Sequence, residues 1–116
     1  MATIKQFEDL LIWKDARSLV QLVYAYCNNI NDKSFTNQMQ RAAISIMNNI
    51  AEGFERSSDK EFYRFLDIAK ASCGEVRSMS YLASDLHYMS SDQSRELEFK
   101  SRLLSGSIYN MMKYLK

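Results

Sequence analysis

The absence of proline is the feature that most limits how this chain can fold. Its 116 residues contain no proline and three glycines. Proline breaks helices, and proline and glycine together form most of the tight turns of β-rich folds. We therefore expect long helices and not a turn-rich β fold. At this length, the chain is expected to form one domain around one core.

Four segments place apolar residues at the spacing of an α-helix, and short polar clusters separate them. The predicted helices cover about 9–30, 35–54, 59–89 and 92–115. Asp9 is expected to cap the first helix, and Ser58 and Glu61 have the spacing of a capping box at the start of the third. Short loops make consecutive helices antiparallel. The predicted fold is all-α, an antiparallel up-down-up-down four-helix bundle in a single domain, residues 1–116.

The segment 38–53 has more apolar surface than a helix with one buried face requires. One apolar stripe suits the core: Met39, Ala43, Ile46 and Ile50. A polar seam runs beside it: Gln38, Arg41, Ser45, Asn49 and Glu52. The seam is either a solvated face or a hydrogen-bond network that sets the register between helices or subunits. Apolar residues on both sides of the seam favour the network.

A second set of apolar residues lies away from the predicted core. On the segment 38–53 it consists of Ile44, Met47 and Ala51, and on the third helix of Ile68, Ala71 and Leu82 around Glu75. Apolar faces that the chain does not cover are typical of subunit contacts. These seven residues are the candidate interface of a homo-oligomer.

The third helix also interleaves basic and aromatic residues along one face, which includes Tyr88. Basic side chains can hold phosphates, and aromatic rings can stack on bases. With two basic residues of the first helix, the candidate nucleic-acid contacts are Lys14, Arg17, Tyr63, Lys70, Arg77 and Tyr81. The alternative is that these residue types are common on any exposed face. A net charge of +1 gives no general basic coat, so contact with RNA or DNA is expected to be weak.

The residues give little support to an enzyme or a metal protein. The single histidine, His87, falls near the apolar face at the end of the third helix and is expected to be structural. Ser84 stands where a Glu-x-x-His metal site needs glutamate. Cys27 and Cys73 lie on the core faces of different helices, without a CxxC motif. We predict no catalytic residues, metal or cofactor, and a small metal-dependent enzyme is the least supported alternative.

The chain has no apolar run long enough to cross a membrane and no signal-peptide pattern at its start. Its two cysteines suit a reducing compartment. The expected location is the cytoplasm, without a membrane partner.

Three strings carry a resemblance to one family: Phe7-x-Asp9-Leu10-x-x-Trp13-x-x-Ala16, Gln38-x-x-Arg41-Ala42-x-x-Ser45-Ile46-x-x-Asn49-Ile50-Ala51-Glu52-Gly53 and Phe62-x-x-Phe65-Leu66-x-Ile68-Ala69-x-x-Ser72-x-x-Glu75. The chain resembles the bacterial four-helix bundle proteins encoded in intervening sequences of 23S rRNA genes. The accessory variability determinant of diversity-generating retroelements resembles the same group.

The resemblance implies an antiparallel four-helix bundle, a ring-like homopentamer and no known catalysis. For the retroelement relatives, it implies a strongly basic barrel that binds nucleic acid and a reverse transcriptase. This chain departs from them in its low net charge and in lacking the prolines often found before the second helix and after Ser45-Ile46, where Met47 stands. The second departure is expected to straighten the helix and not to alter the fold.

The expected function is therefore that of a non-catalytic, oligomeric binding or scaffold protein, associated with RNA or an RNA-processing partner. The alternative is a protein that binds nucleic acid directly, like a retroelement accessory factor.

Overall fold

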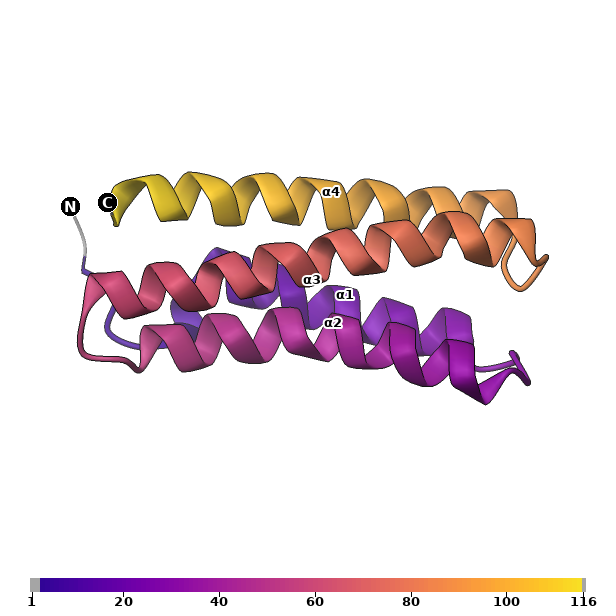
Figure 1. The fold of residues 1–116 in the computed structure, drawn as a ribbon, viewed down its shortest axis with the longest axis horizontal. Coiled ribbons are helices and arrows are strands. Elements are labelled where there is room, and N and C mark those ends of the chain that lie inside the picture. The colour runs from indigo at the N-terminus through magenta and orange to yellow at the C-terminus, as the bar shows by residue number, and fades with distance from the viewer. Residues whose placement is uncertain (1–2, 116) are drawn as a thin grey trace.

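The computed structural model describes residues 3–115, and within this range the chain forms a bundle of four long helices (Figure 1). A short 3-10 helix, η1 (Phe7–Asp9), precedes them. The helices are α1 (Leu11–Cys27), α2 (Lys33–Phe54), α3 (Asp59–Asp85) and α4 (Ser91–Tyr114). Each helix packs against the next, and α4 returns to α1, so that α1 and α3 lie diagonally across the bundle. The predicted antiparallel up-down-up-down bundle is confirmed.

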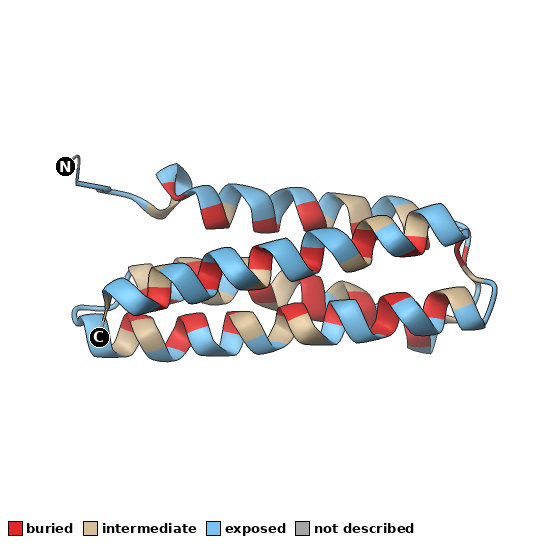
Figure 2. Ribbon diagram, turned by 90° about the horizontal axis from the view of Figure 1, so that it is seen from above, coloured by how far each residue is buried: buried red, intermediate tan, exposed pale blue. Residues whose placement is uncertain are grey.

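The core runs the full length of the bundle, which measures 45 × 21 × 20 Å. Buried residues recur on the inward side of every helix (Figure 2). The stripe predicted to face the core of α2 is completely buried: Met39, Ala43, Ile46 and Ile50. Its helical spacing was therefore a sufficient guide to its orientation.

The helices α2 and α3 lie very close together at Gly53. A Cβ atom at this position would lie 2.6 Å from Cβ of Phe65 and 2.9 Å from Cδ1 of Phe62. Both distances are far below van der Waals contact, so the absence of a side chain on Gly53 lets α3 begin directly against the end of α2.

The start of α1 differs from the prediction. Asp9 lies in η1, and the residue before α1 is Leu10, whose apolar side chain cannot cap a helix. The backbone N–H of Leu10 donates to the carbonyl of Phe7, which closes the 3-10 turn. The carboxylate of Asp9 instead accepts a hydrogen bond from Gln6. The predicted cap was wrong because an extra turn precedes the helix.

The first and third helices are shorter than predicted. The first ends at Cys27 and not near residue 30, where the N–H of Ile30 bonds back to the carbonyl of Cys27. The third ends at Asp85 and not at residue 89, because His87 adopts the left-handed conformation with φ of 58°. The N–H of His87 donates to Ser84 and that of Tyr88 donates to Ala83, the two bonds of a Schellman motif.

His87 itself is exposed, so the prediction of a histidine on the apolar face was wrong. Its backbone ends α3, and its side chain lies outside the core. The next residue, Tyr88, turns back and packs its ring edge-on against Phe35 with centroids 5.2 Å apart.

Candidate functional site

The polar seam of α2 faces α3 and is joined to it by hydrogen bonds. The hydroxyls of Ser45 and Ser72 lie 2.9 Å apart. Asn49 donates to the carbonyl and the hydroxyl of Ser45 at 2.8 and 3.0 Å, and Gln38 donates to Glu75 at 3.2 Å. These residues belong to the second and third sequence strings, so the strings meet across one helix pair.

Two members of the predicted seam lie outside this network. Arg41 and Glu52 are exposed, and they contribute to none of the hydrogen bonds described within residues 3–115. The seam is therefore a mixture of the two alternatives: Gln38 and Ser45 bond to α3 and Asn49 bonds to Ser45, whereas Arg41 and Glu52 face solvent.

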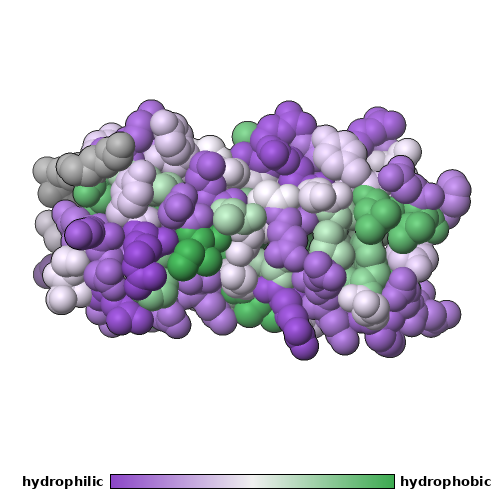
Figure 3. Space-filling view, in the orientation of Figure 1, coloured by the Kyte–Doolittle hydropathy of each residue, from purple (hydrophilic) through white to green (hydrophobic). Residues whose placement is uncertain are grey.

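The candidate oligomer interface divides into an open part and a half-buried part. On α3, Ile68 is 42% and Leu82 is 43% exposed, and Ala71 and Glu75 are exposed between them. Figure 3 shows the hydrophobic colour gathered in separate places on this side of the molecule, with hydrophilic atoms between them. The members on α2 are half-buried: Ile44, Met47 and Ala51. Of the two helices, α3 leaves more of its apolar surface available.

The candidate nucleic-acid contacts do not form one surface. Lys14 and Arg17 are exposed on α1, and α1 lies diagonally opposite the helix that carries the other four. The guanidinium of Arg17 lies over the ring of Trp13, 5.7 Å from its centroid. The structure therefore separates these two residues from the α3 residues.

The α3 residues instead meet a matching set on α4. The ammonium groups of Lys70 and Lys113 lie over the same ring, that of Tyr109, at 5.9 and 5.3 Å from its centroid. Tyr63 and Lys113 line a small hollow with Tyr109, and Tyr81 lines a second hollow with Arg95. These residues of α3 and α4 form the facing flanks of the two helices, and the flanks lie side by side at both hollows.

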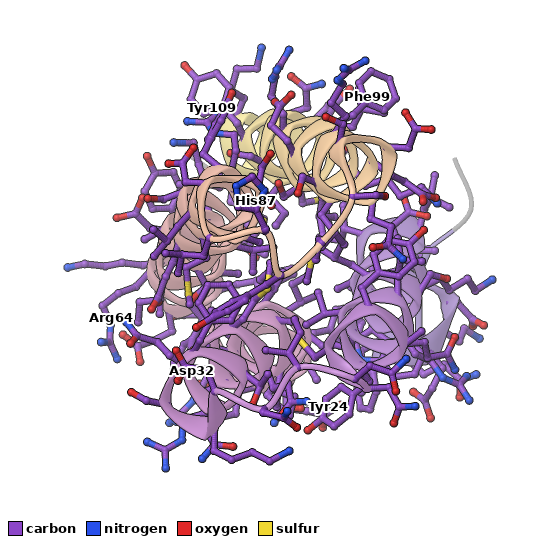
Figure 4. The ribbon with its side chains drawn as sticks, turned by 90° about the vertical axis from the view of Figure 1, so that its right-hand side faces the viewer. Tyr24, Asp32, Arg64, His87, Phe99 and Tyr109 are labelled. Carbon is purple, nitrogen blue, oxygen red and sulfur yellow. The ribbon has the colours of Figure 1, made fainter. Side chains whose placement is uncertain are left out.

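Between the two hollows, helical spacing indicates which other residues belong to the same surface. Arg77 is seven residues after Lys70, and Arg102 is seven residues from both Arg95 and Tyr109, which places each on the same flank as its neighbours. We call the resulting surface the α3–α4 strip: Tyr63, Lys70, Arg77 and Tyr81 of α3, and Arg95, Glu98, Arg102, Tyr109 and Lys113 of α4. Figure 4, seen along the bundle, shows Tyr109 on the side of α4 toward α3 and Phe99 on the other side.

The strip is strongly basic in a protein with a net charge of only +1. Five of its nine residues are basic, and its one carboxylate, that of Glu98, is already paired with Arg102. The exposed Asp67, four residues after Tyr63 and three before Lys70, adds a carboxylate beside the α3 residues. Basic residues therefore outnumber acidic ones along the strip.

Sequence reasoning missed the α4 half of the strip. The signal was the spacing of Arg95, Arg102 and Tyr109 at intervals of seven residues, followed by Lys113. This spacing shows that the residues share a face, but it does not show that the face borders the α3 residues.

Both cysteines are free and buried. Burial raises the pKa of the Cys73 thiol to about 12, although the nearby Lys70 and Arg77 lower it slightly. Burial also raises the pKa of Cys27. The thiolate is the reactive form of cysteine, so these thiols are poor nucleophiles at neutral pH.

Within residues 3–115, no three side chains of His, Cys, Asp or Glu are grouped so that they could hold a metal ion. Over the same residues, each helix is too short or too polar to cross a lipid bilayer.

The fold is shared with a solved structure. A crystal structure of a protein of unknown function from Bacteroides thetaiotaomicron, from the S23 ribosomal protein family, superposes on this chain with a TM-score of 0.82. The two sequences are 20% identical, and the match covers 89% of this chain and 99% of that chain. At this identity, the similarity establishes the fold alone.

Sequence comparison identifies the family. Curated proteins gave no match to the chain. The family described as 23S rRNA-intervening sequence protein matches residues 8–110, which include nearly all of the three sequence strings. This confirms the resemblance carried by those strings. The chain therefore belongs to the 23S rRNA-intervening sequence protein family.

Proposed function

We propose that this protein is a non-catalytic binding protein that contacts RNA through the α3–α4 strip. The observation that carries the proposal is the meeting of two basic and aromatic flanks, from α3 and α4, around the ring of Tyr109. The family description refers to 23S rRNA, which makes RNA the nucleic acid to test first. The free, buried cysteines support the cytoplasm as its location.

The dimensions of the strip suit a nucleic-acid strand. Each flank covers 19 residues, and its first and last residues are about 27 Å apart at the helical rise of 1.5 Å per residue. Basic side chains distributed over this length can pair with successive phosphates, while exposed tyrosine rings offer flat faces to bases. Tyr81 is 58% and Tyr109 is 50% exposed.

The test is a titration with structured RNA between about 50 and 200 mM salt. If all five basic residues contact phosphates, affinity should fall roughly 100-fold for a single-stranded segment and about 500-fold for a duplex over this range, because binding releases counterions from the phosphates. Lys70→Ala/Lys113→Ala should weaken binding and reduce the slope with salt. Lys14→Ala/Arg17→Ala is the matched control, since it removes the same charge from α1. Equal losses in both double variants, or no binding at the lower salt, would contradict the proposal.

A second proposal concerns assembly. We propose that the chain forms a homo-oligomer through the exposed apolar residues of α3, with five subunits as the number that the family resemblance implies. The supporting observation is that Ile68 and Leu82 are exposed on α3. On the same face, Glu75 accepts a hydrogen bond from Gln38 of α2, so part of the polar surface of this face is already bonded. The oligomer would act as a scaffold that presents several α3–α4 strips.

Light scattering or native mass spectrometry tests this assembly directly. Ile68→Glu/Leu82→Glu should lower the mass of the particle, because it places charges in the proposed contact. Phe99→Glu/Leu103→Glu is the control, since these residues of α4 are 54% and 55% exposed. A wild-type protein that stays monomeric at micromolar concentration would reject the proposal.

A further inference from the structure

One end of the α3–α4 strip contains a hollow, and the proposed contact of the strip with RNA does not account for it. It lies between the last turns of α3 and the first turns of α4 and has a volume of about 210 Å³. Its lining has five hydroxyl groups, one guanidinium and one carboxylate: Ser80, Tyr81, Ser84, Ser91, Ser94, Arg95 and Glu98. The hydroxyl of Ser80 is already bonded within α3, and the other hydroxyls and the guanidinium can offer hydrogen bonds to a polar ligand.

Ser94 provides the most specific observation. The residue is only 6% exposed, and within residues 3–115 its hydroxyl has no hydrogen-bond partner. Ser80 and Ser101, which are also buried, donate to the carbonyls of Val76 and Leu97 four residues earlier. A buried hydroxyl without a partner is unusual in a folded protein and calls for an explanation such as a bound ligand.

The charges around the hollow favour an anion. Arg95 is exposed and belongs to none of the ion pairs described within residues 3–115, so its guanidinium is available. The carboxylate of Glu98 is paired with Arg102, which offsets the one negative charge in the lining. α4 begins at Ser91, a lining residue, so the positive end of the helix dipole lies at the hollow. Asp92, in the same turn, is exposed and lies outside the lining.

We propose that this hollow binds the terminal phosphate of an RNA strand that lies on the α3–α4 strip. A phosphate accepts hydrogen bonds on all its oxygens, so it suits hydroxyl donors and an arginine fork. The position at the end of the strip suits a strand terminus, and the ring of Tyr81 can stack on the first base. The RNA part of this inference rests on the proposed function, while the phosphate site stands on the hollow itself.

Three probes separate the sources of the phosphate: inorganic phosphate, and one short RNA carrying either a 5′-phosphate or a 5′-hydroxyl. Binding is measured by fluorescence anisotropy for the RNAs and by backbone amide NMR shifts of Ser94 and Arg95 for inorganic phosphate. The wild-type protein should bind the 5′-phosphate RNA about tenfold more tightly than the 5′-hydroxyl RNA, the effect of one charge-assisted hydrogen bond.

Two variants assign the preference to this hollow. Arg95→Gln and Ser94→Ala should each reduce the preference for the 5′-phosphate RNA, whereas Arg17→Gln on α1 should keep it. The melting temperature of Ser94→Ala should equal or exceed that of the wild-type protein, because the lost hydroxyl has no partner in the described structure. A large drop in melting temperature would show that the hydroxyl has a structural role and would contradict the inference.

The outcomes also separate this inference from the proposed function. Equal affinity for both RNAs, with the expected salt dependence, would overturn the terminal-phosphate site and leave RNA binding by the strip intact. Shifts with inorganic phosphate but no binding of either RNA would support a phosphate site and overturn the RNA function. No response to any of the three probes would overturn both.

Discussion

The two flanks of α3 differ in how they meet their neighbouring helices. α3 packs as extensively on α4 as on α2, and the outer edges of the two contacts differ. Toward α2, Gly53 packs directly on α3, and Ser45 and Ser72 bond to each other across the helix pair. Toward α4, the outer edge is basic and aromatic and contains hollows. The comparison teaches that a helix packed on both sides can still keep one outer edge available for binding. Four changes test this difference, from the largest expected effect to the smallest.

The close side should be intolerant of added volume. Gly53→Ala places a Cβ atom 2.6 Å from Cβ of Phe65, which cannot swing away as the end of a side chain can. We expect a loss of about 3 kcal/mol in the free energy of unfolding, at the upper end of typical overpacking effects. Urea denaturation measures it.

Gly74→Ala and Gly106→Ala are the controls on α3 and α4. Among the described atoms, nothing lies within 4 Å of a Cβ added at either position. Both changes should raise stability by about 0.5–1 kcal/mol, since alanine favours the helix more than glycine does. A Gly53→Ala protein as stable as these variants would remove the distinction between the two flanks.

The open side should show its effect in binding and not in folding. Tyr109→Ala removes the ring that Lys70 and Lys113 share. We expect RNA affinity to weaken by about 1–3 kcal/mol if a base stacks on this ring. Titration at constant salt measures the change, and a thermal melt shows whether the fold is intact.

Phe99→Ala is the matched control for this change. Phe99 is an aromatic residue of the same helix and is 54% exposed, but it points away from α3 (Figure 4). It should leave RNA affinity unchanged. If both variants weaken binding equally, the effect belongs to α4 as a whole and not to the strip.

The hydrogen bonds between α2 and α3 should contribute stability without affecting RNA. Ser45→Ala leaves the hydroxyl of Ser72 without its partner on α2, and we expect a loss of about 1 kcal/mol. Ser45→Ala/Ser72→Ala should cost less than the two single changes added together, because the two hydroxyls bond to each other. Chemical denaturation measures each variant, with the exposed Ser78→Ala as control. Additive losses would show that the hydroxyls act independently.

The smallest effect concerns a bond at one end of the bundle, where the loop before α2 meets the loop after α3. The carboxylate of Asp32, the residue before α2, accepts a hydrogen bond from the Tyr88 hydroxyl at 2.7 Å and one from the Phe35 amide at 3.1 Å. These bonds, that of Tyr88 first, lower the pKa of Asp32 below its ordinary value.

A carboxylate whose pKa is lowered on folding stabilises the native state above its unfolded pKa, and this contribution disappears as the pH falls through the folded pKa. Asp32→Asn should therefore be less stable than the wild-type protein near neutral pH, and the difference should shrink below about pH 4. Thermal melts over this range measure it, and Tyr88→Phe should show part of the same dependence. A difference that is constant with pH would exclude the carboxylate as its cause.

Most of the fold could be predicted from the sequence because helical periodicity is a local property. The buried stripe of α2 followed from helical spacing, and the start of α3 followed from Ser58, whose hydroxyl accepts a hydrogen bond from the amide of Glu61. Asp9 and His87 were predicted wrongly because each depends on backbone geometry, a 3-10 turn before α1 and a left-handed residue after α3. Neither conformation has a strong signature in these residue types.

The sequence by itself determined the four helices, their antiparallel order, the core face of α2 and the family to which the chain belongs. Only the tertiary structure decided that the α4 residues Arg95, Tyr109 and Lys113 lie beside the α3 residues, and that Lys14 and Arg17 do not. The reason is that spacing gives the direction of each residue around its own helix axis. The rotation of one helix relative to its neighbour is set by how the core side chains of all four helices pack together.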